Sequence, residues 1–212
     1  MAEQRGREDE GRHGGHLGAV YDARDPKQVA VLYDVWAAGY DAQMAAAGYR
    51  HPSVGLALLA RHLPGGAVLD AGCGTGLLGD WLAIMGFAPV QGLDISAGML
   101  AVAQAKGSYA GLHQAALGGP LPFGDAAFDG VISTGVFTTG HVGAEGLAEL
   151  VRILRPGGAL VLTVKMPLWD GGFGAALAAL PEVRIVEQTA PYVSMPGEAG
   201  TVPSLAVAAL RV

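Results

Sequence analysis

The fold is decided by one short stretch of the chain, Ala67-Val68-Leu69-Asp70-Ala71-Gly72-Cys73-Gly74-Thr75-Gly76. Its apolar first part reads as a buried strand that ends at Asp70, and the residues from Leu77 to Met85 read as a helix that ends at Gly86. The alternate glycines leave the connecting loop without side chains, so its backbone can turn sharply and approach a ligand closely. A strand, a glycine loop and a helix in this order predict a ligand site at the carboxyl end of the strand.

The same alternation of strands and helices continues on both sides of this stretch. Upstream, helices are expected over 26–47 and 53–62, and the first begins at the capping pair Asp25-Pro26 and ends at Gly48. Downstream, strands are expected at 89–94, 109–115, 128–134, 159–165, 183–189 and 204–212, with helices at 96–106, 144–154 and 168–180. This pattern predicts an α/β fold, a three-layer sandwich with a doubly wound, mostly parallel sheet. The last two strands could form an antiparallel pair at one edge.

The chemistry of the loop narrows the choice of ligand. A dinucleotide loop needs a third glycine at position 77, where this chain has Leu77, and the Gly-Lys-Ser/Thr ending of a phosphate loop is missing. An acid directly before the glycines, Asp70, suits a cationic ligand better than a pyrophosphate. Asp94 ends the next strand, where an acid accepts hydrogen bonds from the two hydroxyls of a ribose. The amino group, sulfonium and ribose of S-adenosylmethionine meet both requirements.

Composition excludes several classes of protein. Of the 212 residues, 51% are hydrophobic and only 15% are charged, against a usual ~25%, so the chain can bury a large core. The formal net charge is −6 and no basic cluster is present, so no nucleic-acid partner is expected. Cys73 is the only cysteine, which excludes an internal disulfide framework, and no metal site is expected. No apolar run reaches the ~18 residues of a membrane span, and no signal peptide is recognised, so a cytoplasmic location is expected.

These motifs resemble the class I S-adenosylmethionine-dependent methyltransferases. The resemblance runs from about Ala67 to Lys165 and includes the glycine loop, the segment 92–96, Pro120-Leu121-Pro122-Phe123, Phe128-Asp129-Gly130-Val131 and Leu154-Arg155-Pro156-Gly157-Gly158. The segments 33–41 and 137–142 are similar to one subgroup, the methyltransferase-like proteins named after the Williams-Beuren syndrome region. The family implies a seven-stranded sheet with an antiparallel last strand. We expect a flexible tail over 1–18 and a single methyltransferase domain over 19–212, made of a helical cap (19–64), a cofactor-binding core (65–165) and a lid with closing strands (166–212).

The resemblance also assigns roles to residues that bind the cofactor. Asp70 and the loop residues Gly72, Gly74, Gly76 and Leu77 would hold the methionine end, Asp94 would bind the ribose, and Ile95 and Met99 would sandwich the adenine. Many relatives have an Asp at the position of Ala116. This chain lacks that side chain, so Ala116 and Leu117 would meet the adenine edge through their backbone groups only. Thr134 would face the methionine moiety, and Tyr33 and Tyr40 would close over the cofactor. For these two tyrosines, burial in the core of an amphipathic helix is an equally good interpretation.

The expected reaction is methyl transfer from S-adenosylmethionine to a small or medium-sized acceptor, leaving S-adenosylhomocysteine. Alignment by the protein can suffice for such an in-line displacement; His141 is the candidate base if the acceptor carries a proton. Apolar residues after the fifth strand suggest a lid over the acceptor, and packing at the sheet edge or a dimer surface is an equally good interpretation; these residues are Trp169, Phe173, Tyr192, Met195 and Pro196. Two alternatives stay open: a protein that binds S-adenosylmethionine without transferring its methyl group, and a nicotinamide-dependent oxidoreductase. The sequence is compatible with a monomer or a homodimer.

Overall fold

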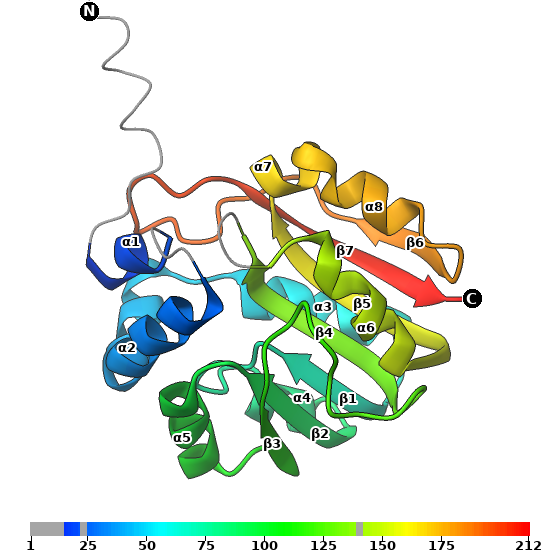
Figure 1. The fold of residues 1–212 in the computed structure, drawn as a ribbon, viewed down its shortest axis with the longest axis horizontal. Helices are drawn as coiled ribbons and strands as arrows, with labels where there is room; N and C mark the ends of the chain where they lie inside the picture. Colours follow the sequence, from blue (N-terminus) through cyan, green and yellow to red (C-terminus); the bar gives the residue numbers. More distant parts are fainter. Residues whose placement is uncertain (1–14, 22–24, 139–141) are drawn as a thin grey trace, which may run out of the picture.

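The computed structural model describes residues 15–21, 25–138 and 142–212, and it shows a twisted sheet covered by helices on both faces (Figure 1). The strands are β1 (Gly66–Ala71), β2 (Phe87–Asp94), β3 (Gly111–Gln114), β4 (Phe128–Phe137), β5 (Leu154–Lys165), β6 (Val183–Gln188) and β7 (Ser204–Arg211). Their order across the sheet is β3-β2-β1-β4-β5-β7-β6. β1 to β5 pair in parallel, and β7 lies antiparallel to both β5 and β6. The expected α/β fold, with seven strands and an antiparallel last strand, is confirmed.

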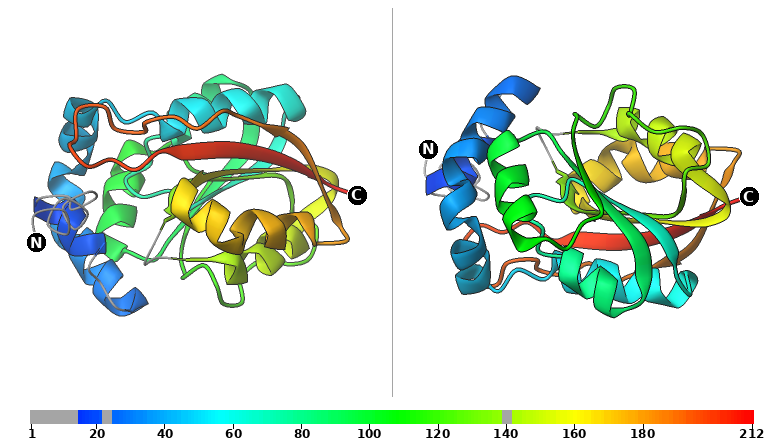
Figure 2. Two further views of the ribbon diagram at one scale, coloured as in Figure 1. Left: turned by 90° about the horizontal axis from the view of Figure 1, so that it is seen from above. Right: turned by 90° about the horizontal axis from the view of Figure 1, so that it is seen from below.

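The helices form two layers and a cap. They are α1 (Gly15–Tyr21), α2 (Pro26–Ala47), α3 (His51–His62), α4 (Gly79–Ile84), α5 (Ala97–Lys106), η1 (Ala144–Gly146), α6 (Leu147–Ile153), α7 (Met166–Leu168), η2 (Trp169–Phe173) and α8 (Gly174–Ala178). α3 and α4 pack on one face of the sheet, and α6 and α8 pack on the other (Figure 2). α1 and α2 lie beyond the carboxyl ends of the parallel strands, beside α5 (Figures 1 and 2).

The central strands are apolar on both sides because both faces of the sheet are covered. Val68 and Ile132 belong to the core beneath α3 and α4, whereas their chain neighbours Leu69 and Val131 belong to the core beneath α6 and α8. This alternation follows from the two-residue period of a strand. Burial of each such aliphatic side chain contributes ~1.5–3 kcal/mol, so the two cores hold the strand ends of the site in fixed positions.

The bounds of α2 agree with the sequence prediction at both ends. The Asp25 carboxylate accepts a hydrogen bond from the Gln28 N–H at 2.9 Å, and Gly48 ends the helix in the left-handed conformation with φ 65°. The predicted helix at 168–180 is not one regular helix. The chain there forms α7, η2 and α8 in succession, because Gly172 has φ 120° and interrupts the helical geometry. The helix after the glycine loop, α4, begins only at Gly79, because the loop continues as turns through Leu78.

The N-terminal part of the described chain packs against the cap. α1 begins at Gly15, so residues 15–18 of the expected flexible tail lie in a helix, and residues 1–14 lie outside the described residues. Val20 of α1 is fully buried beside Trp36 and Met44 of α2 and Met195 of the segment before β7. These residues form a small apolar core of their own. Within the described ranges, no helix combines the length and the apolar character that a membrane span needs.

Candidate functional site

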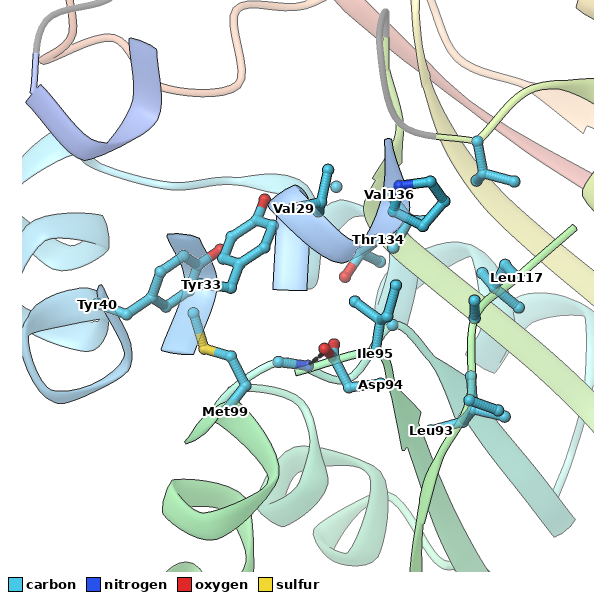
Figure 3. Close-up of a pocket in the computed structure, with 17 residues that line it drawn as sticks. Val29, Tyr33, Tyr40, Leu93, Asp94, Ile95, Met99, Leu117, Thr134 and Val136 are labelled. Carbon is cyan, nitrogen blue, oxygen red and sulfur yellow. Dashed lines mark hydrogen bonds between the residues drawn. The ribbon is translucent and has the colours of Figure 1, made fainter. Parts of the chain in front are cut away.

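Three adjoining hollows lie at the carboxyl ends of the parallel strands, under α2. The first has about 790 Å³ of empty space, which includes space open to solvent (Figure 3). It is bounded by α2, the glycine loop, the end of β2, residues 115–117 and the end of β4. The second, of about 310 Å³, lies against the other side of the glycine loop and shares Tyr40, Gly72, Gly74 and Thr134 with the first. The third is described below.

The glycine loop has the conformation that its sequence predicts. Gly72, Gly74 and Gly76 have φ values of 82°, 54° and 81°, a region that residues with a side chain rarely adopt. A Cβ atom on Gly72 would overlap a methyl group of Val136, while one on Gly74 would have no neighbour within 4 Å. Gly74 therefore faces open space in the hollow.

Gly76 lies in a different environment from the other two glycines. A Cβ atom on it would lie 2.9 Å from the ring of Tyr109 and 3.3 Å from Ala103. It is in the lining of neither hollow. Close packing of the loop against α5 thus accounts for this glycine, and the structure does not bring it together with the other predicted cofactor-binding residues.

Asp94 ties the end of β2 to the glycine loop. Its Oδ2 accepts a hydrogen bond from the Gly74 N–H at 2.8 Å (Figure 3). Its Oδ1 accepts one from the Ser96 N–H at 2.9 Å. Burial raises the pKa of this carboxyl, and the two backbone donors oppose that rise. Each carboxylate oxygen keeps a further lone pair, so Asp94 can accept hydrogen bonds from a ligand in the first hollow.

Asp70 lies at the end of β1 and lines the second hollow. It is 1% exposed; its Oδ2 accepts a hydrogen bond from the Tyr109 hydroxyl at 2.8 Å, and its buried Oδ1 has no hydrogen-bond partner among the described residues. Burial raises the pKa of Asp70 from 3.8 to about 7, and the nearby Asp94 adds to the rise. A buried acceptor left without a donor is costly, so the geometry favours a cationic or hydrogen-bond-donating ligand at this point.

Aromatic side chains of α2 form the outer wall of the first hollow. Tyr33 and Tyr40 both line it, with ring centroids 6.4 Å apart, and they face Met99 and Ile95 across the space (Figure 3). The interpretation that these tyrosines only fill a core is thus incomplete, because they also border the hollow. Val29, one helical turn before Tyr33, completes the wall.

Polar bonds attach α2 to α5 and to the glycine loop. The Asp34 carboxylate accepts hydrogen bonds from the Ser96 hydroxyl at 2.6 Å and from the Gly98 N–H at 2.8 Å. The Asp41 carboxylate accepts one from the Thr75 hydroxyl at 2.5 Å and forms an ion pair with Lys106 at 2.6 Å. A Cβ atom on Gly98 would lie 2.9 Å from the Asp34 backbone, so this glycine allows the close approach of α2 to α5.

The remaining predicted residues divide between the hollows. Ile95, Met99, Ala116, Leu117 and Thr134 line the first hollow, and Leu77 lines the second. His141 lies outside the described residues. Trp169 and Phe173 pack into the core beneath α6 and α8, so the structure does not place them over the site.

Several residues that line the first hollow were not predicted from the sequence, among them Leu93, Val136 and Val142. Val29 could have been found from its four-residue spacing to Tyr33, and Val136 from its place two residues after Thr134. Within the described ranges, no group of three or more His, Cys, Asp or Glu side chains could hold a metal ion.

The sequence is similar to those of known methyltransferases. Residues 69–162 match the family described as Methyltransferase domain. The human methyltransferase-like protein 27 is 38% identical over 152 residues, which cover 69% of this chain; the chain spans 62% of the length of that relative. The demethylmenaquinone methyltransferase of Corynebacterium urealyticum is 32% identical over 178 residues, covering 79% of this chain and 75% of the relative.

A solved structure has the same fold at low sequence identity. It is the Burkholderia thailandensis 1,6-didemethyltoxoflavin-N1-methyltransferase with bound 1,6-didemethyltoxoflavin and S-adenosylhomocysteine. It superposes with a TM-score of 0.62 at 21% identity and covers 90% of this chain and 92% of its own. At this identity the likeness concerns the fold alone.

Proposed function

The chain belongs to the class I S-adenosylmethionine-dependent methyltransferases, and from this premise we propose that it transfers the sulfonium methyl group to a small or medium-sized acceptor. The human relative supports a place among the methyltransferase-like proteins, and the subgroup named after the Williams-Beuren syndrome region is the finer assignment that we propose. The observation that carries the proposal is a pair of acids, the buried Asp70 and the partly buried Asp94, on the two sides of an open glycine loop.

The residues of the site fit S-adenosylmethionine. The buried Asp70 Oδ1 has no hydrogen-bond partner among the described residues, and it is an acceptor suited to the cofactor's ammonium group. Gly74 leaves room for a ligand beside the loop, and Asp94 offers lone pairs to ribose hydroxyls. Ile95 and Met99 would bind the adenine with Ala116 and Leu117 at its edge, while Leu77, Thr134, Tyr33 and Tyr40 would border the methionine end.

The protein's contribution to the reaction would be binding and alignment. When bound, S-adenosylmethionine supplies an electrophilic methyl carbon, and the pair of electrons of the carbon–sulfur bond returns to sulfur as the acceptor takes the methyl group. Tyr40 borders all three hollows, so it would stand beside the line of transfer and help to exclude water. His141 remains our candidate base for an acceptor that carries a proton.

Calorimetric titration with S-adenosylmethionine, S-adenosylhomocysteine and NAD tests the proposal. We expect micromolar binding of the first two and no binding of NAD. The Asp94→Ala variant should bind S-adenosylmethionine more weakly by about 1–3 kcal/mol, the scale of lost charge-assisted hydrogen bonds, whereas Glu182→Ala, an exposed acid before β6, should bind as the unaltered protein does.

Two outcomes would refute the assignment. Binding of NAD alone would favour a nicotinamide-dependent oxidoreductase. Equal affinity of the Asp94→Ala variant and the unaltered protein for S-adenosylmethionine would remove Asp94 from the ribose site. Release of methyl label to an acceptor would exclude a protein that only binds the cofactor.

A further inference from the structure

The third hollow lies next to the proposed cofactor site, and its lining combines polar and apolar side chains. It has about 360 Å³ of empty space, which includes space open to solvent, and it shares Tyr33, Tyr40 and Gly135 with the first hollow. Its walls come from α2, the start of α3, the ends of β4 and β5 and the segment before β7. Its lining is Tyr33, Trp36, Tyr40, Met44, Tyr49, His51, Gly135, Thr138, Lys165, Ser194 and Met195.

Lys165 is the cation of this hollow. It is the last residue of β5 and is 6% exposed, and burial lowers its pKa to about 8, so most of its ammonium stays protonated at pH 7. The described lining contains no carboxylate. The hollow therefore carries a positive charge on its wall.

His51 adds hydrogen-bonding capacity without a second charge. It is 3% exposed, and one of its ring nitrogens, Nδ1, shares a hydrogen bond with the Tyr192 hydroxyl at 2.6 Å. Burial and the neighbouring Lys165 lower the pKa of His51 to about 3, so the imidazole is neutral at pH 7. Its ring is fixed between the rings of Tyr49 and Tyr192.

Ser194 is the second group that points to a ligand. Its side chain is fully buried in the wall of the hollow, and its hydroxyl has no hydrogen-bond partner among the described residues. A hydroxyl in this state can donate to an oxygen that also meets the Lys165 ammonium. Two donors and several aromatic rings in one lining suit a small molecule with an acidic oxygen and an apolar body.

Charge is distributed unequally across the three hollows. Asp94 borders the first hollow and Asp70 borders the second, where the cationic cofactor is proposed to bind. Lys165 borders the third. We propose that the third hollow binds the methyl acceptor, and that it recognises an ionised oxygen of that acceptor, a carboxylate or an acidic phenol or enol, through Lys165 and Ser194. This inference rests on the proposed function.

A matched pair of probes tests the inference on the full chain. The dissociation constants of 4-fluorobenzoate and of its uncharged counterpart 4-fluorobenzamide are measured by fluorine NMR in the presence of saturating S-adenosylhomocysteine. The unaltered protein should bind the carboxylate at least tenfold more tightly than the amide. Lys165→Gln should abolish this preference, whereas Arg184→Gln, which removes one exposed positive charge on the distant β6, should preserve it.

Each result decides the question. Equal binding of the two probes by the unaltered protein, no binding of either, or a preference that survives in Lys165→Gln would overturn the inference. If the Gln variant does not fold by circular dichroism, Lys165→Met, with an unbranched side chain of similar length, gives the same readout.

Titration of each protein with S-adenosylhomocysteine alone separates the two proposals. A protein that binds S-adenosylhomocysteine but does not distinguish the probes refutes only the acceptor site. A protein that fails to bind S-adenosylhomocysteine refutes the proposed function.

Discussion

Replacement of Asp70 by Asn should make the protein more stable at pH 8, but not at pH 5, and a poorer binder of S-adenosylmethionine. Asn keeps the size of the side chain and an acceptor for the Tyr109 hydroxyl, but it removes the charge from a fully buried site. Because burial raises the pKa of Asp70 from 3.8 to about 7, the folded protein binds this proton more tightly than the unfolded chain does. The carboxyl therefore contributes most to stability at low pH, and that contribution is lost as pH rises from 3.8 to about 7.

The size of the effect follows from linkage. At ~1.4 kcal/mol per pKa unit, the shift corresponds to about 4 kcal/mol in total, of which roughly 3 kcal/mol is lost between pH 5 and pH 8. The new amide places an N–H donor at the buried position of Oδ1, which costs about 1–3 kcal/mol at every pH. The variant should therefore be similar to or less stable than the unaltered protein at pH 5, and more stable at pH 8.

Urea denaturation at several pH values measures this difference directly. The cost of the amide is the same at every pH, and the other titrating groups contribute equally to both proteins. Neither therefore affects how the difference in unfolding free energy between the variant and the unaltered protein changes with pH. Asp170→Asn, at an exposed position of η2, is the control and should show no such trend. A difference in stability that is the same at pH 5 and pH 8 would refute the reasoning. Calorimetry at pH 8 should show affinity for S-adenosylmethionine reduced by about 1.5–3 kcal/mol in Asp70→Asn.

Two further substitutions test the geometry around the site. Gly135→Ala should lower the free energy of unfolding by about 1–3 kcal/mol, because Gly135 has φ 78° and the new methyl group would overlap the Tyr49 hydroxyl oxygen. Gly124→Ala is the control and should have little effect, because a Cβ atom there has no neighbour within 4 Å. Equal melting temperatures for the two variants would contradict this. Tyr109→Phe removes a hydrogen bond that favours the ionised form of Asp70, so the pKa of Asp70 should rise above about 7. S-adenosylmethionine binding should then strengthen at a higher pH than in the unaltered protein, and an unmoved midpoint in a pH series of calorimetric titrations would count against the Asp70 assignment.

The sequence was sufficient for the parts of the structure that local rules control. The capping pair at Asp25 and the glycine at 48 gave both ends of α2. The positions of Asp70 and Asp94, each at the end of a strand, were enough to predict that both acids border one ligand site, because parallel strands end at one edge of the sheet. The seven-stranded sheet with an antiparallel last strand was predicted from resemblance to a family, and the order of the strands was not predicted.

What the sequence could not predict depends on contacts between distant segments. Nothing local indicates that Asp34 of α2 accepts hydrogen bonds from the start of α5, and this contact positions the outer wall of the first hollow. The third hollow joins His51, Lys165 and Ser194 from three separate parts of the chain, and each taken alone reads as an ordinary polar residue. Trp169 was expected over the site, but it packs into the core instead, because the interrupted helix from α7 to α8 lies along one face of the sheet.

The way α2 is attached has a consequence for how such proteins can diverge. The helix belongs to a small apolar core of its own and meets the sheet region through the polar contacts of Asp34 and Asp41, apart from the two cores beneath the other helices. Substitutions on its inner face can therefore accumulate over generations with little effect on the folding of the sheet. The strands and the glycine loop would then be conserved, whereas α2 would be the part in which selection can change the range of molecules that the protein binds.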